Sequence, residues 1–234
     1  TNDGKTWSKP FLPHHDGTKT QHAFAALFET ANKGLGVVWL DGRQTVKDRE
    51  SGPMSLRYAA FDDKWKQQAD VAIDTKVCDC CTTSVATTSD GLITAYRNRT
   101  DDEIRDIYVS RMEGTAWTPG TPVHADNWKI PACPINGPAI SARGKDVVVA
   151  WFTTKDDQGQ SFAAFSKDGG RTWGAPIRLD DSTSTGKVDV ELLDDGSAVA
   201  SWVEFVDKHA QLRTRRIEAS GMKSAPIIVV DGDK

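Results

Sequence analysis

The stretch SKDGGRTWGAP, from Ser166 to Pro176, decides the fold, because the chain opens on a second copy, TNDGKTWSKP, from Thr1 to Pro10. Both contain a small polar residue, then Asp-Gly, a basic residue and Thr-Trp, with a proline close behind. Two further segments, FDDKWKQQ (Phe61 to Gln68) and MEGTAWTPGTP (Met112 to Pro122), are weaker copies. The tryptophans of the four segments are 58, 52 and 56 residues apart. This period is typical of propeller blades, on the long side.

Between the motifs lie short runs rich in β-branched and aromatic residues, bounded by Gly, Asp, Asn or Pro, which predict strands. No segment shows a sustained 3.6-residue apolar period. We therefore predict an all-β propeller of four-stranded antiparallel blades. The predicted strands, unit by unit, are His22–Glu29, Leu35–Leu40, Met54–Phe61 and Gln67–Ile73; Thr82–Thr88, Leu92–Arg97, Arg105–Arg111 and Thr118–His124; Pro138–Ala142, Val147–Phe152, Ser161–Ser166 and Ala175–Leu179; Val188–Leu193, Ala198–Val203, Ala210–Ile217 and Pro226–Val230.

The Asp-Gly motifs are expected to be structural. A short acidic side chain accepts hydrogen bonds from its own tight turn, glycine supplies a positive φ, and tryptophan packs the hairpin onto the next blade. The residues assigned this role are Asp3, Gly4, Trp7, Asp168, Gly169 and Trp173.

The composition limits the classes of protein. The chain has 234 residues, a net charge of −4 and scattered basic residues, so it has no basic field for nucleic acid. It has no apolar run approaching the roughly 18 residues of a membrane span. We expect residues 1–234 to form one domain that lacks an N-terminal portion, because Thr1 lies inside a turn motif. Clustered cysteines and eight tryptophans favour export, with the protein periplasmic or secreted.

The motifs TNDGKTW and SKDGGRTW resemble the Asp boxes, or BNR repeats, of the sialidase (neuraminidase) superfamily. The wider sequence around CDCCTTSVATTSDG and PACPINGPAIS resembles a group of exported bacterial sialidase-like proteins. This resemblance covers essentially the whole chain. It implies a propeller that is six-bladed when complete, with four full blades and part of another in this chain. It also implies a carbohydrate or glycoconjugate as the partner.

A sialidase-type hydrolase needs arginines that clamp the sugar carboxylate, an acid that protonates the leaving group, and a tyrosine activated by a glutamate. The predicted loops between second and third strands are rich in charge, and one of them also contains Arg49 and Glu50. The candidates are Arg43, Arg97 and Arg105 as the clamp, Asp41 or Asp106 as the acid, and Tyr96 with Glu204 as the nucleophilic pair.

Three of the four cysteines, Cys78, Cys80 and Cys81, lie within KVCDCC, and the fourth, Cys133, lies in ACPINGP. Both segments precede the inner strands of adjacent predicted blades, so we expect them to meet. One interpretation is a disulfide from the cluster to Cys133, with a second inside the run. Another is a thiolate site for a soft metal, copper or zinc. A single redox-active thiol is the third.

Two functions therefore stay open. The first is an exported, glycan-directed propeller that hydrolyses glycosides in the manner of a sialidase. The second is a non-catalytic propeller for binding or assembly, whose cysteines form a disulfide clasp or a soft-metal site. Neither requires a cofactor, and the second leaves room for a protein partner.

Overall fold

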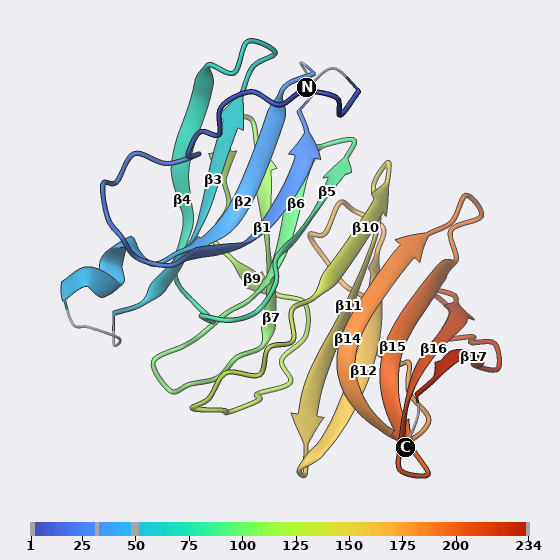
Figure 1. Ribbon diagram of the computed structural model, residues 1–234. Helices are drawn as coiled ribbons and strands as arrows, with labels where there is room; N and C mark the ends of the chain where they lie inside the picture. The colour runs from blue at the N-terminus through green and yellow to red at the C-terminus, as the bar shows by residue number, and fades with distance from the viewer. Residues whose placement is uncertain (1–2, 31–32, 48–51, 233–234) are drawn as a thin grey trace.

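Residues 3–30, 33–47 and 52–232 are described by a computed structural model (Figure 1). Thr1, Asn2, Arg49 and Glu50 lie outside these ranges. The described residues form four antiparallel sheets, each following the chain order of its strands. The one helical element in these ranges is a 3-10 turn, η1 (Arg43–Lys47), and no helix there is long and apolar enough to cross a membrane.

The strands are as follows. The first sheet contains β1 (His22–Glu29), β2 (Leu35–Asp41), β3 (Met54–Phe61) and β4 (Gln67–Val77). The second contains β5 (Ser84–Thr88), β6 (Gly91–Arg97), β7 (Ile107–Glu113), β8 (Ala116–Trp117) and β9 (Thr121–Pro122). The third contains β10 (Ala139–Arg143), β11 (Asp146–Lys155), β12 (Gln158–Ser166) and β13 (Ile177–Arg178). The fourth contains β14 (Thr183–Leu192), β15 (Ala198–Val206), β16 (His209–Ile217) and β17 (Ile227–Asp231).

The sheets stand side by side in chain order, from the blue first sheet to the red fourth one (Figure 1). The first strand of each sheet contacts the first strand of the next, so β1, β5, β10 and β14 form the inner edge of the arrangement. This is the blade arrangement of a propeller, and it confirms the predicted fold class. The predicted total of six blades stays a prediction.

The core lies between neighbouring sheets, and the alternation of side chains along the strands builds it. In β11, Val147, Val149 and Trp151 pack toward the second sheet, whereas Val148 and Ala150 pack toward the fourth. Because successive side chains point to opposite faces, a strand buried on both sides is hydrophobic at every position. A third cluster, which includes Leu56 of β3 and Tyr96 of β6, joins the first and second sheets.

Most strand predictions match the structure, and the main corrections concern outer strands. The predicted strand Thr118–His124 shortens to β9, and another two-residue strand, β8, comes just before the predicted range; both pair with β7. The predicted strand Ala175–Leu179 shortens to β13. Prolines 119, 122 and 176 lie in these segments, and proline cannot donate to a strand ladder.

The turn that contains Asp168 is organised by its carboxylate. This group accepts hydrogen bonds from the amides of Arg171 and Thr172 at 3.0 and 2.9 Å, and from the Thr172 hydroxyl at 2.6 Å. Burial acts to raise the pKa of Asp168, but these hydrogen bonds outweigh it and hold the pKa well below the usual range. Gly169 has a φ of +72°, as the turn requires.

The tryptophans of the four motifs behave differently. Trp173 and Trp117 pack against the clusters between sheets, as expected. Trp7 is 79% exposed and Trp65 is 60% exposed, so the expectation that each tryptophan packs on a neighbouring blade is wrong for these two. Residues 3–21 form no strand, so nothing carries Trp7 against a second sheet, although Asp3 and Gly4 adopt the positive φ of a turn.

Replacement Asp168→Ala is expected to lower the free energy of unfolding by about 2 kcal/mol, because it removes a charged acceptor from several donors. Asp101→Ala is the control. The Asp101 side chain is 97% exposed and pairs with Lys76, so its loss should leave the free energy of unfolding close to the wild-type value. Urea unfolding of both variants gives the comparison, and equal midpoints would contradict the structural role of Asp168.

Candidate functional site

The candidate site lies at the end of the sheets where β2, β4 and β6 end and β1 begins. His22 and Asp41 are paired there across β1 and β2, and the amide of Cys78 donates to the carbonyl of Arg97 at 3.0 Å. Two groups of polar residues lie at this end. One is the sulfur cluster, defined as Cys78, Cys80, Cys81 and Cys133, and the other is the acid–histidine cluster, defined as His14, Asp16, His22, Asp41 and Arg43.

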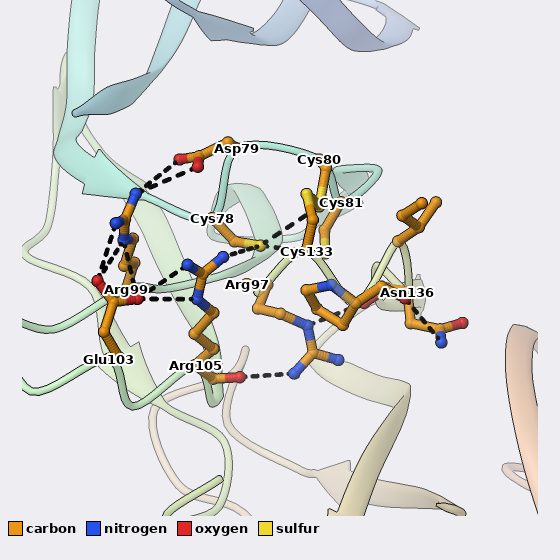
Figure 2. The surroundings of a disulfide bond; sticks show 12 residues. Cys78, Asp79, Cys80, Cys81, Arg97, Arg99, Glu103, Arg105, Cys133 and Asn136 are labelled. Carbon is orange, nitrogen blue, oxygen red and sulfur yellow. Dashed lines mark hydrogen bonds and ion pairs between the residues drawn. A yellow bond between two sulfur atoms is a disulfide. The ribbon is translucent and has the colours of Figure 1, made fainter. Parts of the chain in front are cut away.

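The two cysteine segments meet, as the sequence predicted (Figure 2). Cys80 and Cys133 form a disulfide with a Cα–Cα distance of 6.0 Å. This bond joins the segment between β4 and β5 to the segment between β9 and β10. The expected second bridge, inside the CDCC run, is not formed in this structure. Cys78 and Cys81 are both free cysteines, and both are buried.

The two free thiols touch each other. Cys78 Sγ lies 3.3 Å from Cys81 Sγ and 4.0 Å from Cys80 Sγ. The Nη1 atom of Arg105 donates to Cys78 Sγ at 3.3 Å. The hydrogen bond from Cys81, together with Arg105, lowers the pKa of Cys78, whereas the same hydrogen bond and burial raise the pKa of Cys81. The pKa values of the two thiols therefore move in opposite directions, and Cys78 is the more acidic of the pair.

Arg97 lies beside this pair and is 2% exposed (Figure 2). Its guanidinium donates to three backbone carbonyls, those of Asn136 at 2.9 Å, Arg105 at 2.5 Å and Phe152 at 2.7 Å. It also stacks on Trp128, 5.0 Å from the ring centre. The predicted role in a carboxylate clamp is not supported by this geometry, because the hydrogen bonds of Arg97 serve the main chain.

Arg105 is committed in a similar way. Its Nη2 donates to Glu103 at 2.8 Å, and Glu103 also accepts from Arg99, which reaches Asp79 at 3.1 Å. The hydrogen bond from Arg99, aided by Arg105, lowers the pKa of Glu103 to about 2. The result is a chain of charges that ends on Cys78. The structure places Arg97 and Arg105 together, whereas Arg43 lies in η1, after the second strand of the first sheet.

The other predicted catalytic residues are engaged separately. The hydroxyl of Tyr96 donates to Asp74 at 2.7 Å, and Glu204 accepts from Trp202 Nε1 at 2.8 Å. Tyr96 and Glu204 are not brought together, because they belong to the second and fourth sheets, with the third sheet between them (Figure 1).

Asp106 is also buried. Its carboxylate accepts from the amides of Asn127 and Trp128 at 2.9 and 3.0 Å, and burial raises its pKa. It therefore anchors the segment that leads to Cys133, at a point where its carboxylate is shielded from solvent.

The acid–histidine cluster contains three residues that were not among the candidates from the sequence, namely His14, Asp16 and His22. His22 Nε2 lies 2.9 Å from Asp16 Oδ2 and 3.4 Å from Asp41 Oδ2, so two carboxylates converge on one imidazole nitrogen. His14 Nδ1 approaches the same Asp16 oxygen at 2.9 Å. The signal was present in PHHDGTKTQH, which leads into the first strand and has histidines on both sides of an Asp-Gly turn.

Arg43 neutralises part of this charge. It binds Asp41 through Nε and Nη2, both at 2.8 Å, and its Nη2 lies 3.3 Å from Asp16 Oδ2. Burial acts to raise the pKa values of Asp41 and Asp16, but hydrogen bonds from Arg43 to Asp41, and from Thr18 and His22 to Asp16, outweigh it and lower both. Neither acid is therefore suited to donate a proton at neutral pH.

Two groups in the described residues have donor atoms close enough for a metal ion, namely the clustered cysteines and the set His14, Asp16 and His22. The histidine set fits a metal poorly. The His14 and His22 rings are stacked at 3.8 Å with an interplanar angle of 3°, so their in-plane lone pairs run parallel instead of converging. The nearby Arg43 would also repel a cation.

The sequence matches no protein-family model and no curated protein. Among solved structures, a protein of unknown function from Dyadobacter fermentans DSM 18053 has a TM-score of 0.59 and 16% identity, over 88% of this chain and 68% of that one. Zg3597, a family 117 glycoside hydrolase from Zobellia galactanivorans, has a TM-score of 0.56 and 9% identity, over 97% of this chain and 74% of that one. An α-L-arabinofuranosidase from Lactobacillus brevis has a TM-score of 0.53 and 11% identity, over 90% of this chain and 78% of that one. Identities this low establish a shared fold, so this chain is a propeller of the kind found in glycoside hydrolases.

Replacement Cys133→Ser tests the clasp. The bridge spans a sequence separation of 53 residues, and opening a loop of that length is expected to lower the free energy of unfolding by about 4 kcal/mol in the chain-entropy model. The matched control is Cys81→Ser, which keeps the bridge. Chemical unfolding without reductant gives both values, and a Cys133→Ser midpoint equal to that of the wild type would contradict a structural bridge.

Proposed function

We propose that this chain is an exported, sialidase-like propeller that binds neutral carbohydrate through the acid–histidine cluster, without hydrolysis of the sialidase type. The turns around Asp168 and Asp62 fit the Asp boxes that give the superfamily its repeats. In both, the aspartate side chain accepts hydrogen bonds from the backbone of its own turn. The Cys80–Cys133 disulfide supports export, because such bonds persist in oxidising compartments.

The observation that carries the proposal is the convergence of Asp16 and Asp41 on His22 and Arg43. Carboxylates that accept and a guanidinium that donates are suited to the hydroxyl groups of a sugar. Arg43 is held in place by Asp41, and its Nη1 atom has no hydrogen bond to another described residue. Its side chain is 21% exposed, so a ligand has access to a donor that is already oriented.

Charge favours a neutral ligand over an acidic one. The cluster has two carboxylates with lowered pKa values and one guanidinium, so a sugar carboxylate would meet like charge. A sialidase would also need free arginines, and Arg97 and Arg105 are engaged with carbonyls, Glu103 and Cys78. Sialidase-type hydrolysis is the alternative function, and it requires those contacts to rearrange.

The test compares variants on an array of neutral and sialylated oligosaccharides, followed by calorimetry on the glycans that bind. The wild type should bind neutral glycans. Asp16→Asn should weaken that binding by about 1.5–3 kcal/mol, the range for a charged hydrogen bond. Asp157→Asn is the matched control and should bind like the wild type, because Asp157 is an exposed acid in the turn between β11 and β12.

Binding confined to sialylated glycans, or release of sialic acid from them, would overturn the proposal in favour of the sialidase alternative. Binding that is equal in Asp16→Asn and the wild type would move the site away from the acid–histidine cluster.

A further inference from the structure

The sulfur cluster contains a buried pair of thiols that the fold does not need for its disulfide. Cys78 and Cys81 are 1% and 2% exposed, and their sulfur atoms are 3.3 Å apart. Cys78 Sγ accepts a hydrogen bond from Arg105 at 3.3 Å, and the contact between the two sulfurs is also of hydrogen-bond length.

Positive charge on two sides of the sulfur pair favours thiolate ligands. Arg105 donates to Cys78 Sγ, and the buried guanidinium of Arg97 lies beside the pair. The carboxylates of Asp106 and Asp126 also act on Arg97, and Glu103 is shared by Arg99 and Arg105. An anion formed at the two sulfurs would therefore be stabilised by both neighbouring guanidiniums.

We propose that Cys78 and Cys81 bind one Cu(I) ion between their sulfur atoms. Written from the two free thiols, the step is Cys78–SH + Cys81–SH + Cu⁺ → [Cys78–S–Cu–S–Cys81]⁻ + 2 H⁺. Two sulfur–copper bonds form, two S–H bonds break, the protons leave to solvent and no atom changes its oxidation state. The loaded site has a charge of −1, which the neighbouring guanidiniums of Arg97 and Arg105 stabilise.

The donor set separates Cu(I) from zinc. Thiolates are soft ligands that select Cu(I) and zinc, but zinc in structural sites takes four ligands. Two free sulfurs are present, because Cys80 and Cys133 are bonded to each other and the Asp79 carboxylate is paired with Arg99. A divalent ion on two thiolates would also give a neutral site, which gains less from the neighbouring guanidiniums of Arg97 and Arg105 than an anionic Cu(I) site does. Residues that hydrogen-bond to a metal ligand hold that ligand in its orientation. The hydrogen bond from Arg105 would do this for the Cys78 sulfur.

The inference does not depend on carbohydrate binding, which involves the first sheet. Its test uses the full chain with the disulfide intact, prepared without oxygen and titrated with Cu(I) against a chromogenic Cu(I) chelator. The wild type should bind one Cu(I) per chain. Cys78→Ser and Cys81→Ser should each weaken binding by at least about 100-fold, and Arg105→Gln by roughly 10–100-fold.

Arg99→Gln is the matched control for Arg105→Gln, because Arg99 shares Glu103 but reaches Asp79 instead of a sulfur. Its copper affinity should stay within about threefold of the wild type, the margin expected of a side chain without a ligand contact. If a cysteine variant fails to fold, X-ray absorption spectroscopy of the copper-loaded wild type replaces that comparison. The spectrum should show copper bound to two sulfurs, with no nitrogen or oxygen ligand.

Four results would overturn the inference. They are a wild-type affinity no greater than that of the cysteine variants, a preference for Zn(II) over Cu(I), copper bound by ligands other than two sulfurs, and a disulfide between Cys78 and Cys81 in protein prepared without oxygen.

Discussion

The hydrogen bonds of the buried Arg97 guanidinium are the interactions on which the axial end of this propeller depends. The axial end is the end of the sheets where β2, β4 and β6 end and β1 begins. Arg97 ends β6 and binds carbonyls from the β6–β7 loop, from the segment before β10 and from β11. A charge removed from water is tolerated only when its donors are satisfied, so these segments have to remain where they are. The position of Asn136, three residues after Cys133, follows from this constraint, and so does the approach of that segment to Cys80.

The same constraint links the two halves of the charged network. On one side, Arg99, Glu103 and Arg105 balance one another and end on Cys78 (Figure 2). On the other side, Arg97 has backbone partners and the sulfur pair. The acid–histidine cluster is separate, because its charges are balanced among its own residues. The axial end therefore has two neighbouring sites with different chemistry, one built from oxygen and nitrogen and one from sulfur.

Much of the fold could be predicted from the sequence, because its signals are local. Strand alternation and turn residues located β1, β2 and β3 closely, and the order of the blades brought Cys80 and Cys133 to the same end. The exposed positions of Trp7 and Trp65 could not be predicted, because the motif does not reveal whether a neighbouring sheet exists.

The candidate site was less predictable. Arg97 and Arg105 lie in a charge-rich stretch that suggested a clamp, and backbone carbonyl acceptors leave no mark in a sequence. His14 and Asp16 precede the first strand, in a segment without periodicity, and only the fold brings them to His22. The choice of Cys80 over Cys78 or Cys81 as the partner of Cys133 likewise depends on geometry that three crowded cysteines do not encode.

The most direct test of this account is a peptide map of unreduced protein, alkylated before and after unfolding in the presence of a copper chelator. The account predicts one cross-linked fragment joining Cys80 to Cys133, with Cys78 and Cys81 recovered as thiols that alkylate only after unfolding. A bridge from Cys133 to Cys78 or Cys81 would contradict it. So would a Cys78–Cys81 disulfide, because the account requires two free thiols at these positions.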